Sequence, residues 1–118
     1  MAKIAIAVMA DLQTHSDMAR VVNALHAAKD FKEAGEDVVV FFEGGGVVSA
    51  VAIADPAHNL HRPFALVQDK IIGLCRACSR SFGVADQVEA LGLPFLADFE
   101  QHPSWRRLIA EGYQILTF

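Results

Sequence analysis

The two cysteines of the chain are its most reactive side chains, and both lie in one CxxC motif, at Cys75 and Cys78. A cysteine that ends a strand and begins a helix meets unpaired backbone N–H groups and the positive end of the helix dipole, which favour its thiolate. Arg76 and Arg80 add positive charge nearby, so we expect the pKa of Cys75 to fall below its usual value of about 8.5. The motif predicts a nucleophilic Cys75 that is ionised and open to a partner, with Cys78 as a candidate resolving thiol.

Three other interpretations of the CxxC motif are open. Cys75 could be a small buried hydrophobic residue, as most single cysteines are. The two thiols could form a redox dithiol, because CxxC is the spacing of thioredoxin-type proteins. Those proteins place the motif near the first strand–helix junction, whereas here it follows the third predicted strand. The chain could also be an oligomeric binding module in which the thiols are incidental.

Two histidines extend the motif to a weaker metal-site hypothesis. His58 and His61, with Cys75 and Cys78, supply the Cys2His2 ligand set of structural zinc sites. The HxxH spacing is tighter than the usual one, and a chain of 118 residues can bury enough surface to fold without a metal. We therefore expect neither a metal nor another cofactor.

Strands and helices are expected to alternate along the chain, which indicates a single α/β domain over residues 1–118. Thr14 or Ser16 is expected to cap the first helix, and Gly35 to follow its end. The predicted strands are Lys3–Met9, Asp37–Glu43, Lys70–Leu74, a short Pro94–Phe99 and Tyr113–Phe118. The predicted helices are Asp17–Ala34, Val47–Ala54, Arg76–Phe82, Val84–Leu91 and Pro103–Glu111, with Ala57–Pro63 as a polar loop.

The carboxyl ends of parallel strands are where ligands bind in an open α/β sheet, so the loops at these ends define a candidate pocket. Asp11 and His15 face Cys75 there if the first and third strands are neighbours. Backbone N–H groups at the start of the helix after Cys75 and at Gly44 to Gly46 are expected to stabilise an anionic group there. Two other histidines, His26 and His102, are expected on the surface. Besides the cysteines, the pocket is predicted to include Asp11, His15, Glu43, Gly44, Gly45, Gly46, Arg76 and Arg80.

Three segments of the chain, IIGLCRACSRSFG, VADQVEALG and the terminal EGYQILTF, resemble the DsrE/DsrF-like proteins of the sulfur-relay systems. Cys75 fills the family's cysteine position, and Phe82 stands where the family usually has an arginine. The resemblance implies a three-layer α/β fold with a mostly parallel sheet of about five strands, assembled into dimers, trimers or hexamers. It also implies a sulfur carrier or sulfurtransferase that holds sulfane sulfur as a persulfide on Cys75, exchanging it with donor and acceptor proteins without a cofactor.

The charge balance argues against nucleic acid as a partner, because 10 Lys and Arg stand against 14 Asp and Glu. The longest apolar stretch, Gly44 to Ala54, is too short to span a membrane, which takes about 20 residues. Having only the CxxC cysteines suits a reducing compartment, so we expect a cytoplasmic protein. The hydrophobic share of 53% predicts that another copy of the chain covers part of the surface, as in a homo-oligomer.

Overall fold

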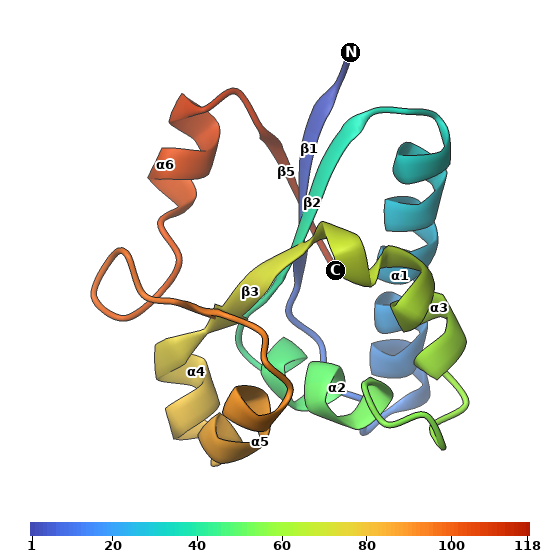
Figure 1. Ribbon diagram of the computed structural model, residues 1–118, viewed down its shortest axis with the longest axis vertical. Coiled ribbons are helices and arrows are strands. Elements are labelled where there is room, and N and C mark those ends of the chain that lie inside the picture. The colour runs from blue at the N-terminus through green and yellow to red at the C-terminus, as the bar shows by residue number, and fades with distance from the viewer.

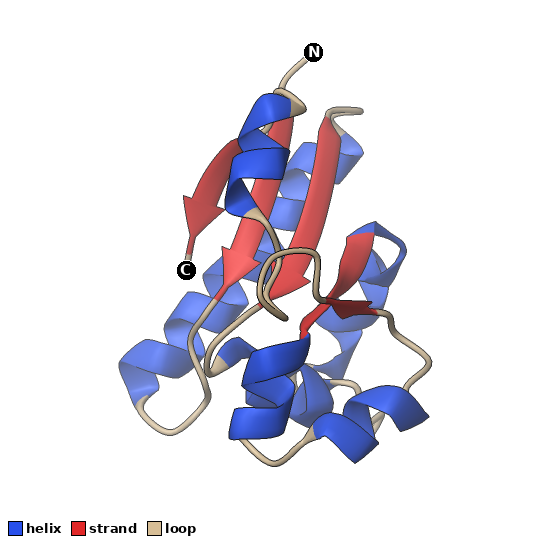
Figure 2. Ribbon diagram, turned by 90° about the vertical axis from the view of Figure 1, so that its left-hand side faces the viewer, coloured by secondary structure: helices blue, strands red, loops and turns tan.

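The computed structural model describes residues 1–118, and its five strands form one parallel sheet in the order β4-β3-β2-β1-β5. All five strands therefore end at the same edge, where several helices and loops gather (Figure 2). The strands are β1 (Lys3–Val8), β2 (Asp37–Phe42), β3 (Ile71–Cys75), β4 (Phe95–Leu96) and β5 (Gln114–Thr117).

Helices cover both faces of the sheet, with α1 and α3 on one side and α6 on the other (Figure 1). They are α1 (His15–Glu33), α2 (Gly46–Ile53), α3 (His61–Val67), α4 (Arg76–Ser81), α5 (Ala85–Ala90) and α6 (Trp105–Ala110), with a 3-10 turn at Gln68–Lys70. None of them combines the length and the apolar character that crossing a bilayer requires.

The side-chain alternation of β1 divides the core between the two faces. Ile4, Ile6 and Val8 point into the larger cluster, which α1 and α2 complete. Ala5 and Ala7 point the other way, into a smaller cluster closed by Phe41 of β2 and Leu108 of α6. The result is the expected three-layer α/β fold, in which the layer formed by α6 is the thinner one.

The predicted ends of the first helix are confirmed within two residues. Thr14 caps α1, since its hydroxyl oxygen accepts the N–H of Asp17 at 3.0 Å. Gly35 follows the helix with φ +77°, a conformation that glycine adopts without the steric cost of a side chain.

Two details of the predicted elements were wrong. The polar loop ends early, because His61–Val67 forms helix α3 and buries Phe64 and Val67; a proline is tolerated in the first turn, so Pro63 does not prevent it. Helix α6 begins at Trp105 with Ser104 as its cap, so Pro103 lies before the helix and not in its first position.

Candidate active site

Cys75 is the last residue of β3 and the N-cap of α4, so the predicted strand–helix junction is confirmed. Its sulfur accepts the backbone N–H of Cys78 at 3.3 Å. The hydroxyl of the buried Ser79 donates to the Cys75 carbonyl oxygen at 2.7 Å. These two bonds fix both the side chain and the backbone of Cys75 at the start of the helix.

The predicted ionisation and exposure of Cys75 are wrong, because the residue is 0% exposed and belongs to the larger core cluster. Burial raises the pKa of the Cys75 thiol from 9.0 to about 12, and the negative charge of Glu43 acts in the same direction. The N–H of Cys78 lowers this pKa as expected, but desolvation outweighs it. The resting group is therefore a protonated thiol. Cys78 itself is half-buried, and both cysteines are free.

A tight turn between β4 and α6 carries His102 to the sulfur. Phe99 and His102 pair through two backbone hydrogen bonds of 2.9 and 2.8 Å. Between them, Glu100 and Gln101 have φ values of 50° and 68°, which are uncommon for residues with a side chain and cost free energy. The Gln101 carbonyl accepts the N–H of Ala77 at 2.9 Å, so the turn is docked on the start of α4.

His102 and Glu43 form a polar chain that leads from the buried sulfur to the surface. The Nδ1 atom of His102 lies 3.1 Å from the Cys75 sulfur and 4.0 Å from Glu43 Oε2. The other carboxylate oxygen of Glu43 accepts the indole N–H of Trp105 at 2.8 Å. The His102 side chain is 46% exposed, so its ring links the buried sulfur to solvent. His102, Glu43 and Trp105 also line a cavity of about 430 Å³.

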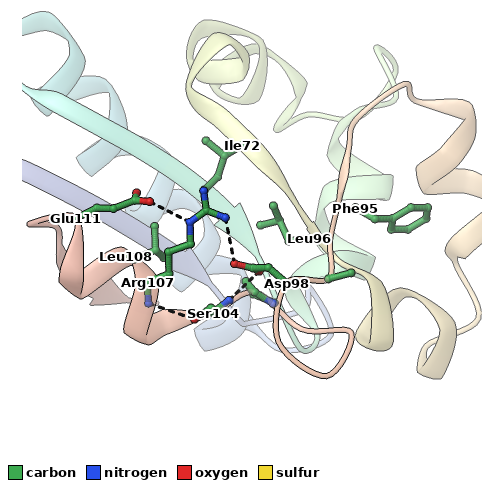
Figure 3. Close-up of a pocket in the computed structure, with 10 residues that line it drawn as sticks. Ile72, Phe95, Leu96, Asp98, Ser104, Arg107, Leu108 and Glu111 are labelled. Carbon is green, nitrogen blue, oxygen red and sulfur yellow. Dashed lines mark hydrogen bonds and ion pairs between the residues drawn. The ribbon is translucent and has the colours of Figure 1, made fainter.

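Arg107 holds the loop that carries His102 in place. Its contacts lie beside a second hollow of about 360 Å³, which Figure 3 shows. Its guanidinium donates to Glu111 at 2.9 Å and lies 3.6 Å from Asp98, which precedes the turn. Asp98 in turn accepts the N–H of Ser104 at 2.9 Å. These contacts join the loop after β4 to α6 on either side of His102.

The residues predicted after the first strand do not reach Cys75, because β2 lies between β1 and β3. His15 is exposed at the start of α1. Asp11 accepts the N–H of Gln13 and, with Gly45, lines a separate open hollow of about 680 Å³.

Among the residues predicted after the second strand, only Glu43 joins the site. Gly44, Gly45 and Gly46 pack against the end of β1 and the residues after it, and the N–H of Gly46 donates to the Glu43 carbonyl at 3.0 Å.

The predicted arginines and the HxxH pair also point elsewhere. The guanidinium of Arg76 lies 5.6 Å from the centre of the Phe95 ring, and Arg80 is exposed. His58 Nδ1 accepts the N–H of Leu60, and His61 Nδ1 contacts the Ile53 carbonyl. This pair of histidines therefore does not lie with the two cysteines in a possible metal site. His102 takes its place, with ligand atoms of all three residues within 4.8 Å of one another.

His102 and Trp105 are the site residues that the sequence prediction missed. His102 was expected on the surface, and Trp105 was not among the predicted site residues. The rule that ligands bind at the carboxyl ends of strands also applies to the loop after β4, and it would have pointed to both residues.

Comparisons with known proteins agree with this fold. The family model described as DsrE/DsrF-like family matches residues 3–118. A protein of Methanocaldococcus jannaschii named uncharacterized protein MJ0733 is 28% identical over 100 residues, which cover 85% of this chain and 81% of that one. BT1422 of Bacteroides thetaiotaomicron, a conserved protein of unknown function, has a solved structure with a TM-score of 0.67 at 16% identity, covering 97% and 94% of the two chains, and it shows the shared fold. The chain thus belongs to the DsrE/DsrF-like family, which is associated with sulfur relay in general.

Proposed function

We propose that the protein is a sulfur carrier, which accepts sulfane sulfur as a persulfide on Cys75 and passes it to an acceptor thiol. The observation that carries the proposal is the 3.1 Å contact between the Cys75 sulfur and Nδ1 of His102 at the start of α4, in a chain of this family. A protonated thiol is a poor nucleophile until an adjacent base takes its proton. His102 supplies that base without requiring a free thiolate in the resting protein.

The loading step transfers one sulfur atom and conserves charge. The Cys75 proton moves to Nδ1 of His102 as the sulfur attacks the outer sulfur of a donor persulfide, R–S–SH. The S–S bond of the donor breaks, R–S⁻ leaves, and Cys75–S–SH remains. The protonated His102 then returns a proton to the leaving thiolate.

The unloading step is the reverse exchange with a different thiol. His102 takes the proton of an acceptor thiol, R′–SH, as the acceptor sulfur attacks the outer sulfur of Cys75–S–SH; R′–S–SH forms, and the leaving Cys75 thiolate takes that proton from His102. Glu43 lies 4.0 Å from His102 and stabilises its protonated form during both steps. Because the His102 side chain is 46% exposed, its displacement opens the path by which a donor reaches the sulfur.

Mass spectrometry of the reduced protein after incubation with inorganic polysulfide tests this proposal. Variants Cys75→Ser and Cys78→Ser are a matched pair, since each removes one thiol of the same motif. We expect the parent and Cys78→Ser to gain a sulfur that peptide mapping places on Cys75, and Cys75→Ser to gain none there and to pass none to an acceptor thiol. We expect His102→Ala to slow loading about 100-fold. Sulfur carried and transferred by Cys78 alone would overturn the proposal.

A redox dithiol is the second candidate, because the two cysteine sulfurs lie within 4.8 Å of each other. In that reaction the Cys78 thiolate attacks the inner sulfur of Cys75–S–SH, HS⁻ leaves, and a Cys75–Cys78 disulfide forms. Release of sulfide with formation of the disulfide, and no transfer to an added thiol, would favour this function over relay.

We further propose that the protein acts in the cytoplasm as a homo-oligomer. The reducing cytoplasm keeps thiols such as the two free cysteines reduced. The sheet face that α6 covers leaves Val39, Ile72 and Ile115 only partly buried, which another copy of the chain would cover. Sedimentation of the purified protein measures this directly, and a monomer at micromolar concentration would contradict it.

A further inference from the structure

The side chains around Cys75 form a cluster of metal-ligand type that sulfur transfer does not require in full. Cys75, Cys78 and His102 place their sulfur and nitrogen atoms within 4.8 Å of one another. The three residues come from two distant parts of the chain, since the junction of β3 and α4 supplies the cysteines and the turn after β4 supplies the histidine. Only the folded protein brings them together.

From this cluster we infer that Cys75, Cys78 and His102 bind a Zn²⁺ ion, with a fourth coordination position left to water or another small ligand. Two cysteines and one histidine are a known ligand set for zinc sites that keep a position open. The inference is independent of whether the protein transfers sulfur. Its ligand set differs from that of the weaker metal-site hypothesis drawn from the sequence, because His102 lies beside the two cysteines and His58 and His61 do not.

The separation between the Cys75 sulfur and His102 Nδ1 suits a tetrahedral ion after a small movement. Bonds of about 2.3 Å to sulfur and about 2.0 Å to nitrogen place neighbouring ligand atoms roughly 3.5 Å apart. The Cys75 sulfur and His102 Nδ1 lie 3.1 Å apart. A shift of a few tenths of an ångström in the exposed His102 side chain opens that gap, while the Cys75 side chain stays fixed by the N–H of Cys78.

The surroundings of the cluster also suit a dipositive ion. Two thiolates balance its charge, and their two protons pass to the buffer on binding. The Glu43 carboxylate lies 4.0 Å from His102 and is held by the indole N–H of Trp105, so it adds negative charge beside the ion. Cys78 and His102 are both partly exposed, and they give the ion a path from solvent to the buried Cys75.

Zinc and persulfide then exclude each other, because both need the Cys75 sulfur. We expect the zinc-loaded protein to take up no sulfur from polysulfide, and a chelator to restore the uptake. The site would thereby keep the thiols from reacting until the ion is removed.

Zinc binding to the reduced, chelator-treated chain tests the inference. We expect one Zn²⁺ per chain by elemental analysis, and a thiolate-to-metal charge-transfer band when Co²⁺ is used instead. Competition with a chromophoric chelator should show affinity reduced more than about 100-fold in His102→Ala and in Cys78→Ser, since loss of an outer partner alone costs about 10–100-fold. His26→Ala removes an exposed histidine of α1 and should bind as the parent does.

Two further measurements keep the outcome decisive. Circular dichroism shows whether each variant is folded, and if His102→Ala is not, His102→Cys replaces the nitrogen ligand with a thiolate and should bind zinc. Parental affinity in a folded His102→Ala chain, or no zinc retained by the parent, would overturn the inference. Sulfur uptake by the parent chain is measured in parallel: a parent that takes up sulfur but no zinc refutes only the metal site, and one that binds zinc but takes up no sulfur refutes only the sulfur carrier.

Discussion

The loops after β1 and β2 and the loops after β3 and β4 leave the same edge of the sheet, but they are built for different purposes. In the first pair, the close contacts are made to backbone carbonyls: Gly46 lies against the Val8 carbonyl, and the Ser49 hydroxyl donates to the Ala10 carbonyl at 2.6 Å. In the second pair, side chains with reactive atoms face each other. Glu43 connects the two halves, since it follows β2 and lies 4.0 Å from His102 in the loop after β4.

This difference shows that position at the carboxyl edge is not sufficient for a catalytic role. The triple glycine Gly44–Gly46 has a composition typical of ligand loops, yet its close contacts are with Val8, Met9 and Asp11 at and after the end of β1. A reactive half needs polar atoms aimed at one another, as at Cys75 and His102, and a supporting shell that holds them. Each prediction below tests the contrast, and they run from the largest expected effect to the smallest.

The largest effect is expected for the protonation of Cys75, which lies in the reactive half, the loops after β3 and β4. Because burial raises the pKa of Cys75 from 9.0 to about 12, its thiolate fraction near neutral pH is about 1,000-fold lower than that of an unshifted thiol. In Cys78→Ser, we expect iodoacetamide to alkylate Cys75 at a rate that rises about tenfold per pH unit and continues to rise above about pH 9. The same variant unfolded in urea is the control, and its rate should level off near pH 9. A folded protein that levels off at the same pH would contradict the buried, protonated thiol.

In the structural half, the loops after β1 and β2, a single added methyl group should lower the stability of the fold. In Gly46→Ala the new Cβ would lie 1.8 Å from the Val8 carbonyl oxygen, so the start of α2 must move away from β1. We expect the free energy of unfolding, measured in urea, to fall by about 3 kcal/mol. Gly45→Ala is the matched control, because its Cβ would meet Asp11 N at 3.1 Å, and about 1 kcal/mol is expected. Equal stability of the two variants would contradict this, because it would show that the backbone at Val8 and Gly46 moves apart at little cost in free energy.

The sequence was sufficient to predict the strands and the place of Cys75, because strands buried on both faces are almost continuous apolar runs. KIAIAV and DVVVFF are such runs, and IIGL leads directly into the cysteine. The burial of Cys75 was not predictable in this way. It depends on which distant segment covers the sulfur, and apolar periodicity carries no such information.

The position of His102 was hidden for a related reason. The turn that delivers it has positive φ values at Glu100 and Gln101, where a sequence reader expects glycine or asparagine. Tertiary contacts, such as the bond from Ala77 N–H to the Gln101 carbonyl, hold this turn in place. Helix α3 was missed because only two of its residues, Phe64 and Val67, are buried, which is too short an apolar pattern to distinguish from a loop.

Loss of the hydrogen bond between Trp105 and Glu43, which links the two halves, should have an intermediate effect on persulfide loading. Trp105→Phe keeps the edge-on contact with the Phe41 ring, whose centre lies 6.0 Å from the indole, but removes the N–H that holds Glu43. A hydrogen bond to a charged group contributes about 1.5–3 kcal/mol, part of which water replaces at this half-buried site. We expect persulfide loading from polysulfide to slow about tenfold, with the urea midpoint nearly unchanged. If loading stays at the parental rate, Glu43 does not assist His102.

The smallest effect on persulfide loading is expected at His15 and Asp11 in the structural half. Only the rule that ligands bind at the carboxyl ends of strands assigns these two residues to the pocket. His15→Ala removes an exposed imidazole from the start of α1, and Asp11→Asn removes a charge whose carboxylate oxygen bonds only locally, to the N–H of Gln13. β2 separates both residues from β3, so neither has a path to Cys75 within one chain. We expect loading rates within about twofold of the parent for either variant, since surface substitutions usually change free energies by less than about 0.5 kcal/mol. A tenfold loss in His15→Ala would mean that the first loop of a second copy completes the site, and the two halves of the edge would then meet across a subunit interface.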